Sequence, residues 1–348
     1  MEIDLLWLVA SFGGGAFGAA IGGQTAFIFT GLLYLVGLGG YLGGLDAGFF
    51  MGSVVFGPVF GPHIAFLGGA AAAAYAAKKG VMAGGANGRD IVTPLAGISR
   101  PDVLAVGGIF GMIGYTLNQV LASWGGFSVA MDSNHLHSMG EGVNATIGWT
   151  DTDALTIVII SIAIRFMFGS TGLFSTKDHP LLAVGEGKHW VEHQEGWGIT
   201  AMHGFTSGLM SAFASIMIIV FYFTMTGGGT EIVGFAHLIG WAISAVTLIF
   251  LSLGMKTPVT HHMTLVASLA AIKFAPILVG SNSVADWADN SMVIVAVLIG
   301  AVFGALAGLL GEALSRMTNA NGDTHIDPPA FAIWIGTSVL YVLTAILA

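Results

Sequence analysis

Residues 106–121 read VGGIFGMIGYTLNQVL and residues 299–314 read IGAVFGALAGLLGEAL, and these two stretches decide the fold that the sequence predicts. Aligned without gaps, they share two glycines, a phenylalanine and two leucines, and Gln119 falls on Glu312. Two further landmarks follow the same order along the chain. Residues 150–153 match residues 324–327, and Pro62-His63 falls beside His261 and His262. Such self-similarity indicates an internal repeat.

The composition indicates an integral membrane protein. Charged residues make up 8% of the 348 residues and hydrophobic residues 55%, whereas a soluble domain typically carries about 25% charged residues. The chain has no cysteine, which excludes disulfides, thiolate nucleophiles and Cys-ligated metal sites. Its net charge of −9 includes no basic run, so no nucleic-acid partner is expected. The lipid bilayer is the expected environment.

Ten apolar stretches predict membrane-crossing helices, since a helix needs about 20 apolar residues to cross a bilayer. Residues 1–12 are too few to cross separately and predict an interfacial lead-in, with an eleventh span as the alternative. Gly57-Pro58 and Gly61-Pro62 cannot continue a regular helix, so we expect a broken helix before the third stretch and a matching break before the eighth. The ten stretches are 13–38, 44–59, 62–79, 102–123, 153–173, 199–224, 232–254, 259–279, 291–315 and 329–347.

The repeat and the count together predict an all-α polytopic membrane protein with about ten transmembrane helices in a 5+5 inverted-topology repeat. Five spans per half is an odd number, so the second half must insert upside down, as in many secondary transporters. We expect the first half at 1–173, a cytoplasmic connector at 174–197 and the second half at 198–348.

The basic residues support this count. Eight of the ten fall in loops on one side of the predicted membrane, which the positive-inside rule makes the cytoplasm. Both termini are then expected outside, in a multi-pass protein of the cell membrane. These eight are Lys78, Lys79, Arg89, Arg100, Lys177, Lys188, Lys256 and Arg316.

Seven polar side chains within or beside the spans are the candidate substrate-binding residues, because polar groups in a bilayer usually face a cavity or a partner. Histidines at the two helix breaks would sit at opposed half-helix ends, where free N–H groups favour anions. Arg165 would either pair with a carboxylate or bind an anionic ligand. Lys273 is expected to snorkel outward. The candidates are His63, His261, His262, Asn118, Gln119, Arg165 and Glu312.

Two polar clusters have spacings that suit either a divalent metal or helix capping. The first contains residues 132–137 with Glu141 and Asp151, and the second contains residues 323–327. Asp residues also favour turns and helix N-caps, so Asp153 and Asp327 are expected to cap the fifth and tenth spans. The glycine clusters lack a strand–helix context, so no cofactor is expected.

The leading functional interpretation is a secondary transporter for a small polar or anionic solute, bound between the repeats and coupled to protons or sodium. A passive channel and a divalent-cation transporter are alternatives. A membrane-anchor subunit or an enzyme is less favoured, because the chain has no nucleophile motif and no sizeable loop, so no catalytic residue is predicted. Faces of small residues also allow a homo-oligomer.

Overall fold

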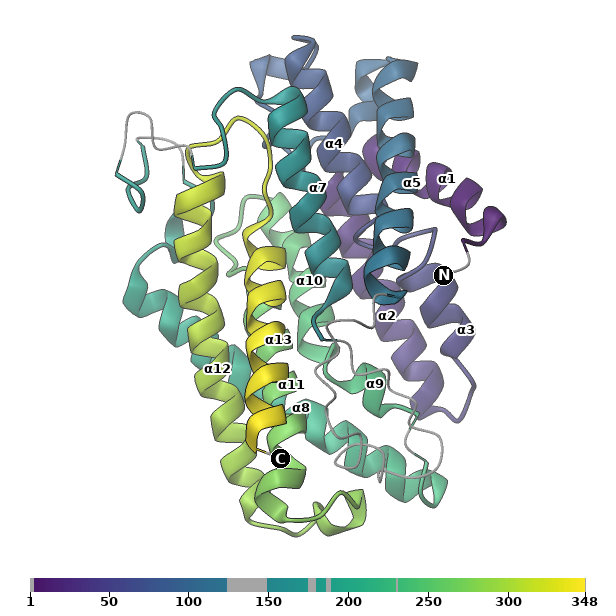
Figure 1. Ribbon diagram of the computed structural model, residues 1–348, viewed down its shortest axis with the longest axis vertical. Helices are drawn as coiled ribbons and strands as arrows, with labels where there is room; N and C mark the ends of the chain where they lie inside the picture. The colour runs from purple at the N-terminus through teal and green to yellow at the C-terminus, as the bar shows by residue number, and fades with distance from the viewer. Residues whose placement is uncertain (1–2, 124–148, 175–179, 186–188, 230, 348) are drawn as a thin grey trace.

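The computed structural model describes residues 3–123, 149–174, 180–185, 189–229 and 231–347, which form an all-helical structure without a named strand (Figure 1). Its principal helices are α1 (Leu5–Ile21), α2 (Gly23–Leu42), α3 (Gly48–Phe50), α4 (Ala65–Lys78), α5 (Pro101–Ser123), α7 (Thr152–Phe168), α8 (Trp197–Thr226), α9 (Val233–Ala236), α10 (Ile239–Ser252), α11 (His261–Val279), α12 (Met292–Leu314) and α13 (Pro328–Leu347).

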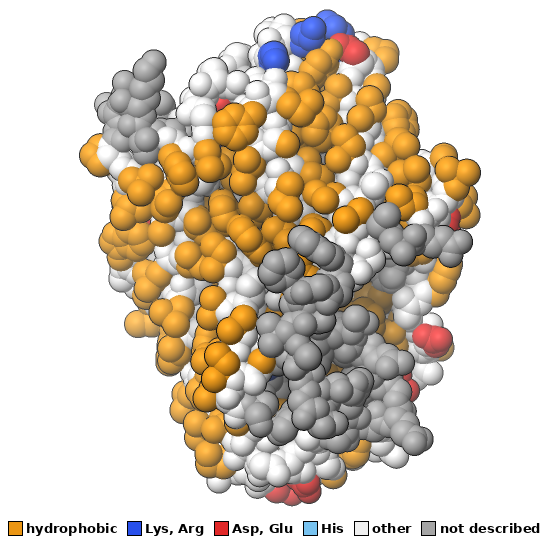
Figure 2. All heavy atoms as spheres, viewed as in Figure 1, with side chains coloured by type: hydrophobic (Ala, Val, Ile, Leu, Met, Phe, Trp, Pro, Cys, Tyr) orange, Lys and Arg blue, Asp and Glu red, His pale blue; other side chains and the backbone are white. Residues whose placement is uncertain are grey.

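Seven helical stretches in the described part are long and apolar enough to cross a membrane. They are α2, α5, α8, the α9–α10 stretch, α11, α13, and α12 with its π-helical extension Ser315–Asn319. Large apolar side chains are widely exposed, and Figure 2 shows them over most of the visible face, with Lys and Arg gathered at one end. An exposed apolar surface of this extent fits lipid rather than water. The protein is a helical membrane protein.

The N-terminal region differs from the prediction. The stretch 13–38 is two helices rather than one, because Gly22 turns the chain between α1 and α2 with φ +90°, a conformation that glycine adopts without steric cost. Residues 1–12 are not a separate lead-in either. Helix α1 begins at Leu5, and Asp4 caps it by accepting the N–H of Leu6 at 2.8 Å.

The stretch 44–59 also differs, because it holds only α3 and its π-helical continuation Met51–Val55, which are too short to cross a membrane. Helix α4 starts later, at Ala65, after the segment with Pro58 and Pro62. In the second half the chain is likewise non-helical between Ser252 and His261. The helices are therefore interrupted before α4 and before α11, as the sequence predicts.

Glycines bring three helices of the first half into close contact. Helices α1, α4 and α5 pack on one another, and Gly15 of α1 faces Gly107 and Gly111 of α5. A Cβ on Gly15 would collide with the carbonyl oxygen of Gly107. A Cβ on Gly68 of α4 would collide with the backbone of both Gly15 and Gly107. Close backbone approach through small residues is typical of membrane helices, where dispersion rather than hydrophobic exclusion favours association.

An equivalent contact joins three helices of the second half. Helices α8, α11 and α12 pack on one another, and Gly204 and Gly208 of α8 face Gly304 of α12. Ala267 of α11 lies against Gly208, so it occupies the place that Gly68 has in the other contact. We call α1, α2, α4, α5 and α7 the N-terminal group, and α8 to α13 the C-terminal group.

Helices α2 and α10 join the two groups. They run in opposite directions side by side, with Gln24 Nε2 donating to Ser252 Oγ at 2.8 Å at one end of the contact. A Cβ on Gly31 would press on Ala242 and Ala245, so the contact is close at its centre. Helices α7 and α13 form a second contact between the groups.

Four connecting segments that carry basic residues contact one another. Arg89 Nη1 donates to the carbonyl oxygens of Asn319 (3.1 Å) and Ala320, and Arg316 Nη2 donates to Glu195 O at 2.7 Å. His193 Nε2 lies 3.0 Å from the carbonyl oxygen of Thr257. The α4–α5, α7–α8, α10–α11 and α12–α13 connections are the ones in which the sequence predicts the basic loops. Lys177 and Lys188 lie outside the described residues.

Candidate functional site

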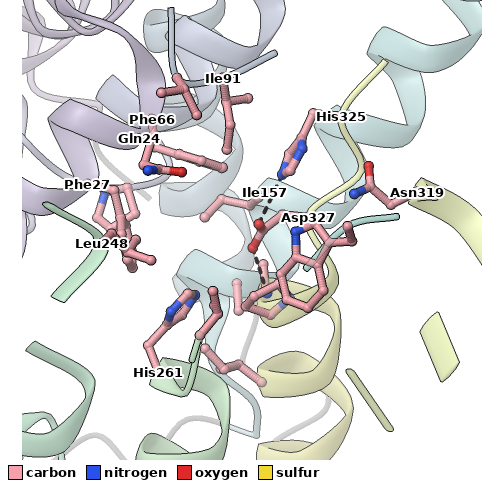
Figure 3. Close-up of a pocket in the computed structure, with 18 of the residues that line it drawn as sticks. Gln24, Phe27, Phe66, Ile91, Ile157, Leu248, His261, Asn319, His325 and Asp327 are labelled. Atoms are coloured by element: carbon pink, nitrogen blue, oxygen red, sulfur yellow. Dashed lines mark hydrogen bonds and ion pairs between the residues drawn. The ribbon is translucent and has the colours of Figure 1, made fainter. Parts of the chain in front are cut away.

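A cavity of about 560 Å³ lies between the N-terminal and C-terminal groups, within the size range of small-molecule sites. Figure 3 shows side chains from both groups projecting into it. Wall residues come from α2, α4 and α7 on one side, from α10, α11 and α13 on the other, and from the connecting segments. Among them are Phe27, Phe66, Ala154, Ile157, Trp241, Leu265, Ala330 and Ile333.

Two helices point their N-termini at the cavity through the same short motif. Residues 151–157 read DTDALTI and residues 327–333 read DPPAFAI, so each contains aspartate, alanine and isoleucine at the same spacing. Asp151 accepts the N–H of Ala154 at 2.8 Å, and Asp327 accepts the N–H of Ala330 at 2.7 Å. In both motifs the aspartate, alanine and isoleucine line the cavity. Asp327 is the N-cap that the sequence predicts, but Asp151, not Asp153, caps α7.

Asp153 has a different role, because it lies in the first turn of α7 and holds two partners. His63 Nδ1 is 3.1 Å from Asp153 Oδ1, and Asn118 Nδ2 donates to the same oxygen at 2.6 Å. His63 and Asn118 are both buried. Asp153 lines the cavity, so the two predicted residues lie one contact behind the wall. Gln119, next to Asn118, is half-buried and lies outside the described cavity wall.

His261 and His262 begin α11 and point to different places. His261 lines the cavity and packs on Phe27 with ring centroids 4.9 Å apart. Its Nδ1 has no hydrogen-bond partner among the described residues, although the side chain is only 6% exposed. His262 is fully buried away from the cavity, against Gly311 of α12 and the Trp190 ring. Of these two histidines, only His261 is placed to contact a bound solute.

The cluster at residues 323–327 makes contacts within itself and with the segment after α7. His325 Nε2 lies 3.1 Å from Asp327 Oδ1, and Asp323 accepts hydrogen bonds from Ser170 and Thr171. Within the described ranges no group of three or more His, Asp or Glu side chains is arranged to hold a metal ion. The other predicted cluster, at residues 132–137 and Glu141, lies outside the described residues.

Arg165 is fully buried and tied to the segment before α13. Its Nε donates to Thr324 Oγ1 at 2.6 Å and its Nη2 to the carbonyl oxygens of Thr318 and Thr324 at 3.0 and 2.7 Å. Asp323 is its carboxylate neighbour, with Nε and Oδ1 3.7 Å apart. Burial raises the pKa of Asp323, but hydrogen bonds from Ser170 and Thr171 outweigh it and hold that pKa below its usual value. The guanidinium therefore lies in a structural network outside the cavity wall.

Glu312 is buried near the end of α12 and pairs with Arg316 one turn later, with Oε1 and Nε 2.6 Å apart. The Arg316 guanidinium also lies 4.6 Å from the centre of the Trp197 ring. Close by, Glu195 forms a hydrogen bond with His189, which raises the pKa of that imidazole. His189 lines the cavity, whereas Glu312 lies behind its described wall.

Lys273 does not snorkel outward as the sequence predicts. It is 5% exposed, and its Nζ lies 4.4 Å from the centre of the Tyr341 ring of α13. Among the described residues that ammonium has no hydrogen-bond partner. Its long side chain stays inside because α11 is surrounded by α8, α10, α12 and α13, which leaves no short route to the surface.

Several cavity residues are not among the predicted substrate-binding residues, although Asp151 belongs to the first predicted polar cluster. Asp151, Gln24, Trp241 and Arg89 all line the cavity. The repeated D-x-x-A-x-x-I motif would have revealed Asp151 together with Asp327, had the two helices been aligned on their caps. The aromatic and glutamine residues carry no sequence signal of this kind, because Phe and Trp are ordinary in apolar spans.

Comparisons with curated proteins and with solved structures find no match. A family model does match, over residues 1–137 and 175–347, which together cover most of the chain. The chain therefore belongs to DUF7973, a family of unknown function.

Proposed function

We propose that the two helix groups are inverted repeats and that the chain is a secondary transporter with its substrate site between them. The corresponding pairs are α1 with α8, α2 with α10, α4 with α11, α5 with α12, and α7 with α13. This gives ten segments, five in each half. They differ from the predicted ten only at the N-terminus, where α1 and α2 replace the stretches 13–38 and 44–59.

The glycine contacts support the repeat residue by residue. Gly111 of α5 faces Ser11 and Gly15 of α1, and Gly304 of α12 faces Gly204 and Gly208 of α8. The ungapped alignment of residues 106–121 with residues 299–314 places Gly111 opposite Gly304. A repeat accounts for the same neighbouring helix lying in the same register in both groups.

The position of the cavity supports transport. The paired motifs at Asp151 and Asp327 line it from both groups, and both broken connections, at Pro62 and at Val259, end at its wall. Sites between inverted repeats, at the ends of interrupted helices, are typical of secondary transporters, which expose such a site to each side of the membrane in turn. The presence of both D-x-x-A-x-x-I helix ends at one cavity is the observation that carries the proposal.

Solute counterflow in proteoliposomes tests the proposal and separates a carrier from a channel. Vesicles preloaded with one unlabelled solute from a panel of small polar compounds are diluted into a trace of the same labelled solute. A carrier concentrates the label transiently, and Asp327→Asn abolishes this, whereas Asp289→Asn, at an exposed carboxylate between α11 and α12, leaves it intact. Uptake that never exceeds equilibrium for any solute carried would identify a channel and contradict the proposal.

A further inference from the structure

The charges in the cavity wall are mostly negative. Four carboxylates line it, those of Asp90, Asp151, Asp153 and Asp327, against one guanidinium, that of Arg89, and the imidazoles of His189, His261 and His325, of which His325 lies 3.1 Å from Asp327. Arg89 is engaged elsewhere, because its Nη1 donates to the carbonyl oxygens of Asn319 and Ala320 at the end of the α12 extension. The cavity therefore offers a bound solute more acceptors than cationic groups.

The helix N-termini that would attract an anion are already occupied by the protein's own carboxylates. Asp151 caps α7 and Asp327 caps α13, each accepting a backbone N–H of the first turn. A capping aspartate satisfies one of the free N–H groups, and its negative charge offsets the positive end of the helix dipole. An anionic solute beside either end would meet a carboxylate rather than open N–H groups.

The rest of the wall suits the apolar body of an organic cation. Phe27 packs edge-on against Trp241 with centroids 5.1 Å apart, and Phe56 lies 5.8 Å from the same indole. Aromatic rings attract cations as well as apolar groups. His261, with an unpartnered Nδ1, lies beside Phe27, and Figure 3 shows it projecting into the same space as Asp327.

From these contacts we propose that the substrate is an organic cation with an apolar body, such as a protonated amine. Its ammonium group lies between Asp151 and Asp327, with His261 as a further acceptor, and its apolar part lies against the rings of Phe27 and Trp241. This assignment of substrate class rests on the proposed site between the repeats, and it differs from the anionic solute that the helix ends alone would favour.

A matched pair of ligands tests the sign of the charge. Purified protein in detergent is dialysed to equilibrium against radiolabelled 2-phenylethylammonium or 3-phenylpropionate, which share a phenyl ring and a two-carbon linker but carry opposite charges. We expect saturable binding of the ammonium at least about tenfold tighter than that of the carboxylate. Asp151→Asn and Asp327→Asn should each weaken ammonium binding about tenfold or more, whereas Asp289→Asn should not change it.

Each other outcome overturns the assignment. Equal or tighter binding of 3-phenylpropionate, no saturable binding of either ligand, or ammonium binding that survives both aspartate substitutions would contradict a cation site. The proposed transport is judged separately, by counterflow. Ammonium binding without counterflow of the bound amine would support the cation site and contradict the proposed carrier. Counterflow of carboxylates alone would support the carrier and contradict the cation site.

Discussion

The helix starts of α4 and α11 are corresponding positions in the proposed repeat, yet their histidines have different surroundings. In the N-terminal group His63 is held by Asp153, which Asn118 also contacts. In the C-terminal group His262 lies against Gly311 without a partner in the described part of the chain, and His261 lines the cavity instead. The glycine contacts are alike in both groups, whereas the polar contacts differ. The two groups thus share their backbone packing, whereas they contribute different polar side chains to the cavity wall.

The largest loss of stability is expected at the glycine contacts, where the two groups are most alike. Gly15→Leu and Gly204→Leu each push a side chain into the backbone of a neighbouring helix, which no rotamer relieves, so each should destabilise the protein by about 3 kcal/mol or more. The measurement is the Tm of the purified protein in detergent. Gly13→Leu on α1 and Gly198→Leu on α8 are matched controls, because a Cβ at either position meets nothing within 4 Å.

If the two groups are repeats, Gly15→Leu and Gly204→Leu should lower the Tm by similar amounts, and both control substitutions should leave it unchanged. A large loss for one glycine and none for the other would show that the two contacts are not equivalent.

Arg165 tests a contact between the two groups, because it ties α7 to the segment before α13. Arg165→Met leaves Thr324 and the nearby carbonyl groups without their donor and should cost about 3 kcal/mol. Lys78→Met is the control, because the exposed Lys78 ammonium makes its hydrogen bond, to Met167 O, at the surface. Folded Arg165→Met protein that has lost substrate affinity while keeping its Tm would instead show that the guanidinium binds the solute.

The two histidines give a direct contrast. His63→Leu removes the buried imidazole beside the half-buried Asp153 carboxylate, which keeps its hydrogen bond from Asn118, and should cost about 1 kcal/mol. His262→Leu removes a ring with no described partner and should cost nothing or stabilise the protein. Chemical unfolding of both variants is the measurement. Equal losses would mean that His262 has a partner of its own and that the halves are more symmetric than their contacts indicate.

The smallest change in stability is expected for a substitution at Lys273. Lys273→Met replaces a buried ammonium that lacks a described hydrogen-bond partner by an apolar side chain of similar length, and should raise stability by about 1 kcal/mol after loss of the contact with Tyr341. Lys79→Met, at an exposed position beyond α4, should leave the Tm unchanged. A lower Tm for Lys273→Met alone would indicate that the ammonium has a partner in the membrane-embedded protein.

The sequence predicts the helices well where apolar length and proline decide them, as at α5, α12 and the breaks before α4 and α11. It fails at Gly22, because one glycine in an apolar run looks the same whether the helix continues or turns. Among the site residues, the histidines at the helix breaks are found, but which one faces the cavity depends on one residue of helical rotation. Arg165 could not be assigned, because its partners Thr318 and Thr324 are distant in sequence and uncharged.

The inverted arrangement of the two groups requires the α4–α5 and α11–α12 connections to lie on opposite sides of the membrane. Labelling of these two connections tests that arrangement most directly. Figure 1 shows the end of α4 and the start of α12 at opposite ends of the molecule. Because the chain has no cysteine, Lys79→Cys and Asp289→Cys each provide a single labelling site, in corresponding loops of the two halves. A membrane-impermeant maleimide applied to intact cells should label one variant, and label the other only after the cells are opened. Labelling of both from the same side would contradict the inverted repeat.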